Sequence, residues 1–431
     1  MNDLPKVLVI ASTPFSKTKN NGKTLSSFFE TYDRNLIAQF SYSGGDFNSD
    51  ICDNYYFLTK EDVISGRKGA AYKSDSIRKK DSTIETITKK SFIHSLFHIF
   101  SQARNPIALW IKDQTWKKAD YSKAFDWIDQ FNPDVVFFQG FSMAYGYDFA
   151  LNVCKRNNIP MILELTDDYT HRLYPLSIVE KINQVRYMKL FTEAIRFASK
   201  TIVISDLMKE EYESRYGGNM DVMMNTVNAI NPDSDCDRIP NDYVYAGNLL
   251  LNRWKVLRNL GKALSQVNQK ATLNIYTPDV PPKHILKSLS KISSIRYGGR
   301  LSKEELESRL KKCEYVVHVE AFDKKNRKIT RLSMSTKISE YVACGAKVLA
   351  IGPSDVASMR CFSDNNLGIC VNSPSVKKIA EKLNREITIE DYRRNATNFI
   401  KKCASKSNGT RIKKYVIDAV TYYQNENAAE T

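Results

Sequence analysis

The sequence lacks any apolar run of the roughly 20 residues that a membrane-spanning helix needs. Its apolar start, Val7–Ala11, is far shorter and has neither the basic flank nor the small-residue cleavage site of a signal peptide. The eight cysteines include no CxxC pair, and the five histidines have no acidic or cysteine companions at metal-ligand spacing. These absences predict a cytosolic protein with reduced thiols and without a bound metal.

Positive charge is abundant, with a net charge of +16 and a pI near 9.3. A positive charge of this size favours binding to nucleic acid, to an anionic membrane face or to phosphorylated substrates. No zinc finger, helix-turn-helix or aromatic RNP-like motif supports nucleic-acid binding, so we predict none. Residues 67–123 hold thirteen basic and five acidic residues, with Phe92, Leu96 and Phe100 at helix spacing. We interpret this segment as a contact for an anionic membrane surface; the alternative is that its apolar residues pack on the N-terminal sheet.

The alternation of short apolar runs with helical patterns predicts an α/β protein. A length of 431 residues allows two or three domains, and a hydrophobic fraction of 42% is typical of folded proteins. The predicted strands are residues 6–11, 38–42, 134–139, 161–165 and 201–205 in the first half, and 243–246, 272–276, 295–297, 315–319, 347–351 and 367–371 in the second. Helical patterns lie between many of them, at residues 123–130, 147–156, 258–267 and 303–312. We therefore predict parallel sheets in two Rossmann-like, doubly wound domains.

The break between the two domains is predicted from polar, helix-breaking residues in the middle of the chain. Residues 229–242 contain two prolines among Asn, Asp and Ser, a composition typical of linkers. The predicted organisation is therefore an N-terminal domain (1–228), the linker (229–242), a C-terminal domain (243–408) and a terminal helix with its tail (409–431). The terminal helix is free to pack on either domain.

Residues 331–345, with the sequence RLSMSTKISEYVACG, carry the clearest chemical signal. Ser335 is expected to cap a helix, and Gly345 is placed to end it. A helix N-terminus attracts anions, and Lys337 would place a cation in the first turn, where only a bound anion favours it. Glu340 could accept hydrogen bonds from ribose hydroxyls. The alternative is an exposed Lys–Glu pair with no ligand.

This segment resembles the donor-binding segment of GT-B glycosyltransferases, close to the family 4 and group 1 proteins of bacterial surface polysaccharide synthesis. Those proteins carry a Ser-Thr-Lys-Ile-x-[Glu/Asp]-Tyr-x-Ala-x-Gly segment, which residues 335–345 match, followed by a hydrophobic strand and a Gly-Pro, here Gly352 and Pro353. Weaker landmarks follow the family order at residues 200–210, 225–228, 245–248 and 297–300.

The resemblance implies a GT-B fold with an interdomain cleft, in which a sugar passes from a nucleotide-diphosphate donor to a glycan or lipid-linked acceptor. It implies a retaining, metal-independent hexosyltransferase that needs no cofactor besides its donor and works in the cytoplasm, at the inner face of the membrane. The expected donor-binding residues are Gly247, Arg253, Lys255, Arg331, Ser335, Thr336, Lys337 and Glu340. They would stabilise the departing diphosphate.

The sequence departs from the family pattern at one position. Many members have two glutamates eight positions apart; Glu340 matches the second, but Leu332 stands at the first. Glu320, at the end of a predicted strand, is our candidate substitute. Two alternatives stay open: a nucleotide-sugar epimerase of the same fold and, because of the missing glutamate, a catalytically inactive GT-B scaffold.

In the N-terminal half, Asp167 and Asp168 follow a predicted strand and are candidates to orient the acceptor hydroxyl or to act as a base. The alternative is a helix cap or a turn. Gly22 and Lys23 lie in a loop that resembles the family's glycine-containing loop near the acceptor and the phosphates. Position 17 is lysine, where a P-loop has its first glycine, so we do not predict an ATPase.

Overall fold

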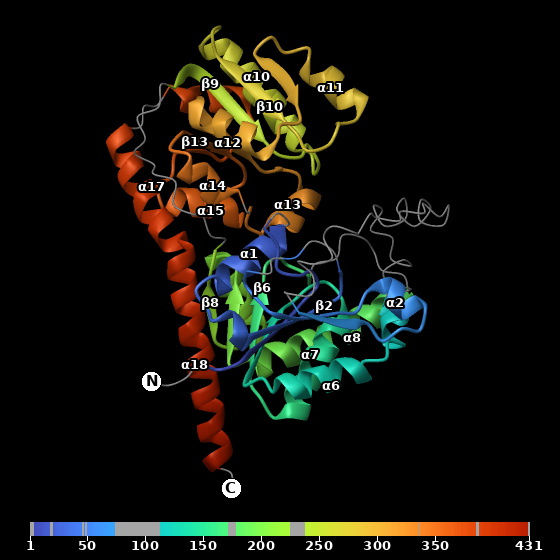
Figure 1. The fold of residues 1–431 in the computed structure, drawn as a ribbon. Helices are drawn as coiled ribbons and strands as arrows, with labels where there is room; N and C mark the ends of the chain where they lie inside the picture. Colours follow the sequence, from blue (N-terminus) through green and yellow to red (C-terminus); the bar gives the residue numbers. More distant parts are fainter. Residues whose placement is uncertain are drawn as a thin grey trace. The chain divides into compact units, whose positions relative to one another are not determined.

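The computed structural model describes residues 4–17, 20–44, 47, 50–73, 113–170, 178–224, 238–335, 337–384 and 388–429. The chain divides into two compact units (Figure 1). Unit 1 comprises Met1–Val203, Lys209–Met223 and Asn408–Thr431, and unit 2 comprises Ile204–Met208 and Met224–Ser407. The C-terminal residues therefore group with unit 1, although the sequence alone left their partner open.

Unit 1 is built on an eight-stranded sheet with the order β4-β3-β2-β1-β5-β6-β7-β8. Its strands are β1 (Val7–Ala11), β2 (Ile37–Ser41), β3 (Asn54–Phe57), β4 (Ala70–Lys73), β5 (Val135–Gln139), β6 (Met161–Leu165), β7 (Lys200–Val203) and β8 (Met220–Val222). All neighbours are parallel except β3 and β4, which are antiparallel. Every residue of β1, β2, β5 and β6 is buried, as expected for a sheet covered on both faces.

Helices cover both faces of this sheet (Figure 1). They are α1 (Asn20–Phe29), α2 (Lys60–Ile64), α6 (Ser122–Phe131), α7 (Ala144–Asn157), α8 (Ile178–Phe197), α9 (Asp206–Tyr216) and α18 (Ser405–Ala429). Neighbouring residues of β5 identify the two faces, because successive side chains of a strand point in opposite directions. Phe137 packs edge-on against Phe28 and Phe29 of α1, whereas Phe138 packs against Tyr147 of α7.

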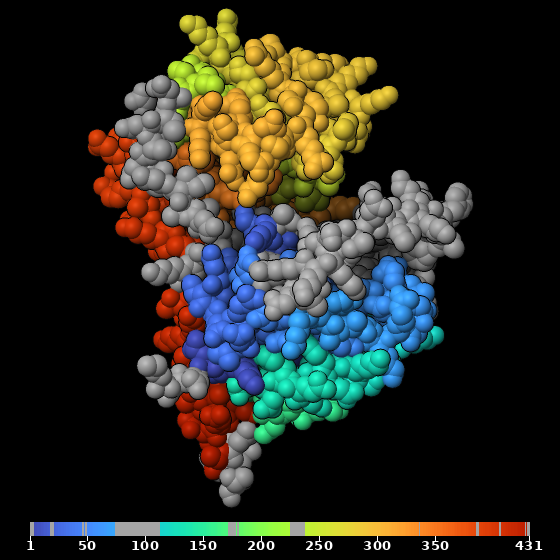
Figure 2. Space-filling view, viewed as in Figure 1, coloured from blue at the N-terminus to red at the C-terminus, as the bar shows by residue number. Residues whose placement is uncertain are grey.

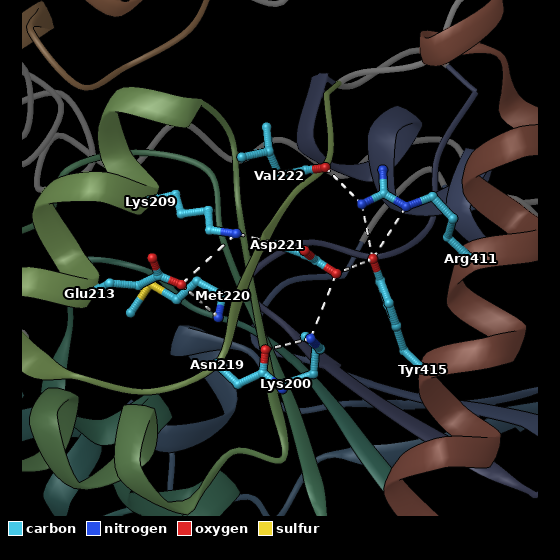
Figure 3. Close-up of polar contacts among 9 residues, drawn as sticks. All are labelled: Lys200, Lys209, Glu213, Asn219, Met220, Asp221, Val222, Arg411 and Tyr415. Carbon is cyan, nitrogen blue, oxygen red and sulfur yellow. Dashed lines mark hydrogen bonds and ion pairs between the residues drawn. The ribbon is translucent and has the colours of Figure 1, made fainter.

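The terminal helix α18 packs on the α1 face of unit 1. Its apolar residues Ile412, Tyr415 and Val416 join the core cluster of β1 and α1, and the space-filling view shows α18 in red along the blue N-terminal residues (Figure 2). A polar network fixes the helix to β8 (Figure 3). Tyr415 Oη donates to Asp221 Oδ2 at 2.7 Å, and Arg411 Nη2 donates to Val222 O at 2.9 Å.

Unit 2 is built on a six-stranded parallel sheet with the order β11-β10-β9-β12-β13-β14. Its strands are β9 (Ile239–Ala246), β10 (Thr272–Tyr276), β11 (Ile295–Gly299), β12 (Cys313–Val319), β13 (Lys347–Ile351) and β14 (Ile369–Val371). Strand β9 begins at Ile239, inside the range predicted as a linker. Pro240 is compatible with this early start, because proline is tolerated in the first residues of a strand.

The helices of unit 2 are α10 (Arg253–Val267), α11 (Lys283–Leu289), α12 (Lys303–Lys312), α13 (Lys324–Thr330), α14 (Ile338–Ala343), α15 (Ala357–Asp364), α16 (Val376–Leu383) and α17 (Ile389–Cys403). Leu257 and Leu260 of α10 pack with Leu349 on one face of the sheet, and the residues of α14, α15 and α17 pack with Val348 on the other. The predicted pair of doubly wound α/β units is therefore confirmed. None of the helices in the described ranges is both long enough and apolar enough to cross a bilayer.

Candidate functional site

The candidate site lies at the carboxyl edge of the sheet in unit 2. Three neighbouring parallel strands, β9, β12 and β13, end there at Ala246, Val319 and Ile351. The residues that follow each strand are Gly247, Glu320 and Gly352. Because the carboxyl ends of parallel strands meet at one edge, ligands of such sheets bind at this edge. Among the described residues predicted to bind the donor, Gly247, Arg253 and Lys255 follow β9 in the sequence, and Arg331, Ser335, Lys337 and Glu340 lie between β12 and β13.

Lys337 ties the start of α14 to the end of β9. Its Nζ donates to Ala246 O at 2.9 Å, and Tyr341 Oη donates to the same oxygen at 2.5 Å. Burial lowers the pKa of Lys337; the neighbouring Glu340 carboxylate opposes this shift, and the like charge of Arg253 adds to it. The charges of Glu340 and Arg253 therefore both act on the ammonium group of Lys337.

The predicted helix cap at Ser335 was wrong. Helix α14 has six residues and begins at Ile338, with Lys337 as its N-cap and no side-chain cap. Ile338 N donates to Ser335 O at 3.1 Å, so a single turn precedes the helix. Ser335 Oγ instead accepts a long hydrogen bond from Lys337 N, at 3.4 Å. Thr336 lies outside the described residues.

Arg253 and Glu320 form a buried ion pair at the same edge. Arg253 Nη2 lies 3.1 Å from Glu320 Oε2 and 3.3 Å from Oε1, and the two side chains are 19% and 4% exposed. Nε2 of His318 lies 3.4 Å from Glu320 Oε1. Burial alone would raise the pKa of Glu320, but the His318 and Arg253 side chains hold it below its ordinary value. The carboxylate is therefore ionised at neutral pH and is not a proton donor.

The loop that leads to Arg253 has unusual backbone geometry. Leu251 and Asn252 both have left-handed conformations, with φ of 55° and 61°. Two such non-glycine residues in sequence cost roughly 1–3 kcal/mol each, and strain of this kind gathers at ligand sites. Asn252 Nδ2 donates to Asp323 Oδ2 at 3.0 Å and so helps to hold the loop. A Cβ at Gly247 would lie 2.8 Å from Tyr245 Oη, so a larger residue at the start of this loop would require the Tyr245 side chain to shift.

In the described part of the chain, the other two basic candidates, Lys255 and Arg331, do not contact the buried Glu320. Lys255 is exposed, with its Nζ 5.7 Å from the Trp254 ring centroid. Arg331 Nε lies 3.8 Å from Asp355 Oδ2, and Arg331 O accepts from Ala357 N. Of the two basic residues that the sequence could not separate, it is therefore Arg253 that pairs with the buried glutamate.

Leu332, which stands where the family has a glutamate, belongs to the core of unit 2. Its side chain is 2% exposed, and its carbonyl oxygen accepts from Ser205 Oγ at 3.0 Å. A glutamate in this conformation would bury its carboxylate. The side chain at position 332 therefore lies in the core of unit 2, where a leucine fits.

In unit 1, the Asp168 carboxylate accepts hydrogen bonds that stabilise a turn. Asp168 Oδ1 accepts from Thr170 N at 3.0 Å, from Thr170 Oγ1 at 2.6 Å and from Tyr212 Oη at 2.8 Å. Asp167 is exposed, and its Oδ1 accepts from Asp168 N at 2.9 Å. These contacts match the turn that the sequence allowed as the alternative for Asp168.

The loop before α1 closes tightly on itself. Ser16 N donates to Gly22 O at 3.2 Å, and a Cβ on Gly22 would lie 2.4 Å from Pro14 O. Glycine is therefore required at position 22 for packing. Lys23 is exposed.

Glu164, at the carboxyl end of β6, is a buried acid that sequence reasoning did not single out. It is 2% exposed and lies beside Gln139 of β5 in the parallel register. Burial raises the pKa of Glu164 to about 7. The only sequence signal was an acidic residue inside the apolar run MILEL.

Glu164→Gln is expected to flatten the pH dependence of stability. A carboxyl whose folded pKa lies above its unfolded value binds a proton preferentially in the folded state, so stability falls as pH rises from about 4.5 to about 7. The glutamine variant avoids this loss and should gain about 3 kcal/mol over the wild type at pH 8 relative to pH 4.5. Thermal unfolding of both proteins across this range measures the difference, and parallel curves would contradict the assignment.

The comparisons with known proteins agree with this architecture. Residues 244–419 match the family model of the glucosyltransferase 3-like, C-terminal domain. No curated protein matches the sequence significantly. The apo structure of OtsA is similar at a TM-score of 0.56 and 11% identity, covering 96% of this chain and 99% of that one. Sucrose-phosphate synthase from Thermosynechococcus elongatus is similar at a TM-score of 0.54 and 11% identity, covering 98% of this chain and 100% of that one.

A third similar structure is the UDP-forming α,α-trehalose-phosphate synthase from Burkholderia xenovorans, with a TM-score of 0.53, 9% identity and coverage of 97% of this chain and 100% of that one. These structures share the GT-B fold, so the fold predicted from the resemblance is confirmed. Residues 244–419 are thus similar to a glucosyltransferase 3-like C-terminal domain. Membership of family 4 stays a prediction.

Proposed function

We propose that this protein transfers a sugar from a nucleotide-diphosphate donor, bound at the carboxyl edge of unit 2, to a glycan or lipid-linked acceptor in cell-surface polysaccharide synthesis. One observation carries the proposal: two cations lie at this one edge, Lys337 with its Nζ on Ala246 O at the end of β9 and Arg253 beside Glu320 at the end of β12. A bound diphosphate would lie beside both cations, and opposite charges at such short distances attract.

The two cations suit the electrostatic task of this reaction. Negative charge grows on the diphosphate as it leaves the sugar, and positive groups already in place stabilise that charge without reorganisation. In this proposal Lys337 and Arg253 neutralise the leaving group and Glu340 accepts from the ribose, without a metal. No group of three or more His, Cys, Asp or Glu positioned to bind a metal occurs in the described parts of the chain.

Asp167 and the loop of Gly22 and Lys23 are proposed to face the acceptor. The engagement of Asp168 in its turn argues against Asp168 as a free general base. A mechanism with retention of configuration needs no such base, and the family resemblance also favours retention. Analysis of the anomeric configuration of the product by NMR would test this point.

Product analysis tests the reaction class. The full chain would be incubated with UDP-glucose, UDP-N-acetylglucosamine or GDP-mannose, with and without a lipid-diphosphate-linked N-acetylglucosamine. A transferase should give a longer lipid-linked glycan only when the acceptor is present. Conversion of the nucleotide sugar into its epimer without acceptor would favour the epimerase. A scaffold would bind nucleotide and give neither product.

We also propose that the protein works on the cytoplasmic face of an anionic membrane. Most of the basic segment 67–123 lies outside the described residues. A described feature of unit 1 supports the proposal: Ile178, Ile182 and Val185 are 78%, 65% and 70% exposed along one side of α8. The exposed Lys181 and Lys189 flank them. Apolar residues bordered by lysines suit a membrane surface.

Liposome flotation tests this placement. The wild type should float with vesicles of phosphatidylglycerol and phosphatidylcholine at low salt and should be released at high salt. Ile182→Asp should weaken flotation, whereas Val280→Asp, at a residue of unit 2 that is 85% exposed, should not. Absence of flotation at low salt would remove the membrane proposal and leave the donor site untouched.

A further inference from the structure

Glu320 is buried at the edge of the candidate site. It follows β12 directly and is 3% exposed, and its amide donates to Ile351 O at 2.9 Å, which continues the β12–β13 ladder. An ionised carboxylate this deeply buried is unfavourable unless specific partners compensate for lost water. Its position also keeps it from the donor, because a carboxylate with so little exposure has no free surface for a substrate.

The partner of Glu320 is Arg253, and helix stability does not explain the pair. Arg253 is the first residue of α10, where a cation opposes the helix dipole. Replacing a buried ion pair by apolar residues is often neutral for stability, so such a pair is weak evidence of a stabilising role. The pair fixes the position of the Arg253 guanidinium. Arg253 Nη2 contacts both carboxylate oxygens of Glu320, and Arg253 Nη1 lies 3.4 Å from Asn248 Oδ1.

His318 is the second neighbour of the carboxylate. It precedes Glu320 by two residues, and its Nε2 lies 3.4 Å from Glu320 Oε1. The imidazole is 6% exposed and packs against Phe362, with ring centroids 5.2 Å apart. The Glu320 carboxylate therefore has a packed imidazole and the Arg253 guanidinium as neighbours.

We propose that Glu320 is a positioning residue, which holds the Arg253 guanidinium ready for the donor diphosphate. The inference rests on the proposed function, since the diphosphate is the ligand that Arg253 receives. Glu320 thereby acts through Arg253 and not on the reacting sugar. A group already fixed in its binding position loses less conformational freedom when the ligand arrives, so the affinity for the diphosphate rises.

Calorimetric titration of a double-mutant cycle tests this role. UDP, GDP, ADP and dTDP serve as probes for the wild type, Arg253→Ala, Glu320→Gln and the double variant of the full chain. Glu320→Gln should weaken binding of the preferred diphosphate about tenfold, and the double variant should bind no more weakly than Arg253→Ala. Affinity for the corresponding nucleoside, which has no phosphate, should not change.

Two outcomes would overturn the inference while the donor site stands: Glu320→Gln binds as tightly as the wild type although Arg253→Ala does not, or the losses of the two single variants multiply in the double variant. A wild type that binds none of the four diphosphates contradicts the proposed function itself. Should Glu320→Gln fail to fold, Glu320→Asp keeps the charge and withdraws it from Arg253, and the same weakening is expected.

Discussion

Replacing Lys337 by alanine should weaken the binding of the preferred nucleoside diphosphate about 10- to 150-fold. A hydrogen bond to a charged group contributes about 1.5–3 kcal/mol, which corresponds to this range of affinity. The variant also loses the contact of Lys337 Nζ with Ala246 O, which joins α14 to the end of β9. Titration calorimetry of the full chain measures the change.

Lys312→Ala is the matched control for this experiment. Lys312 is an exposed lysine of unit 2 at the end of α12, next to the start of β12 and therefore at the opposite edge of the sheet. Removing it deletes the same charge without touching the site, so the affinity should stay unchanged. Equal weakening in both variants would mean that Lys337 contributes only to a general basic field, as in the exposed Lys–Glu alternative.

Asp242→Ala should destabilise unit 2 by about 3–5 kcal/mol, because it leaves the partly buried guanidinium of Arg309 without its carboxylate partner. Asp242 is 4% exposed and accepts from Arg309 at 2.6 and 2.7 Å, and also from Asn274 at 2.7 Å. The pair joins α12 to β9. Thermal unfolding should show a midpoint lower by about 10 °C for a unit of this size.

The control for this variant is Glu307→Ala, which removes an exposed ion pair from the same helix. Glu307 lies 3.8 Å from Lys303, with side chains 50% and 67% exposed. Exposed pairs of this kind contribute less than about 1 kcal/mol. A similar fall in the midpoint of both variants would show that the burial of the Asp242 pair has no special energetic consequence.

The sequence predicted the bounds of three strands to the residue, although Glu164 interrupts the apolar run of β6 and Asn274 that of β10. Strands β6, β10 and β13 begin and end at the predicted residues. Strand β14 begins at Ile369 and not at the predicted 367, because Gly368 has a φ of 123° that a regular strand does not allow. The exposed edge strand β4 was not predicted, because Ala70–Lys73 carries no buried face that would give a pattern.

The candidate site was visible in the sequence only in part. Lys337 and Glu340 follow from their position in the motif, whereas the choice of Arg253 over Lys255 depends on the left-handed residues that set the start of α10. Glu320 was predicted as a substitute glutamate for chemistry. Its burial against Arg253 comes from the packing of β12 and α10. The two residues are 67 positions apart in the sequence, and no local pattern encodes their contact.

Ligand-induced stabilisation of the full chain tests the central claim most directly. UDP-, GDP- and dTDP-sugars would each be added in excess, and the thermal midpoint would be measured for the wild type and Lys337→Ala. A ligand at a hundred times its Kd stabilises the folded state by about 2.7 kcal/mol, a rise of about 5–10 °C here. We expect at least one nucleotide sugar to give this rise in the wild type and much less in the variant. No stabilisation of the wild type by any of them, or equal stabilisation of both proteins, would contradict a donor site at Lys337.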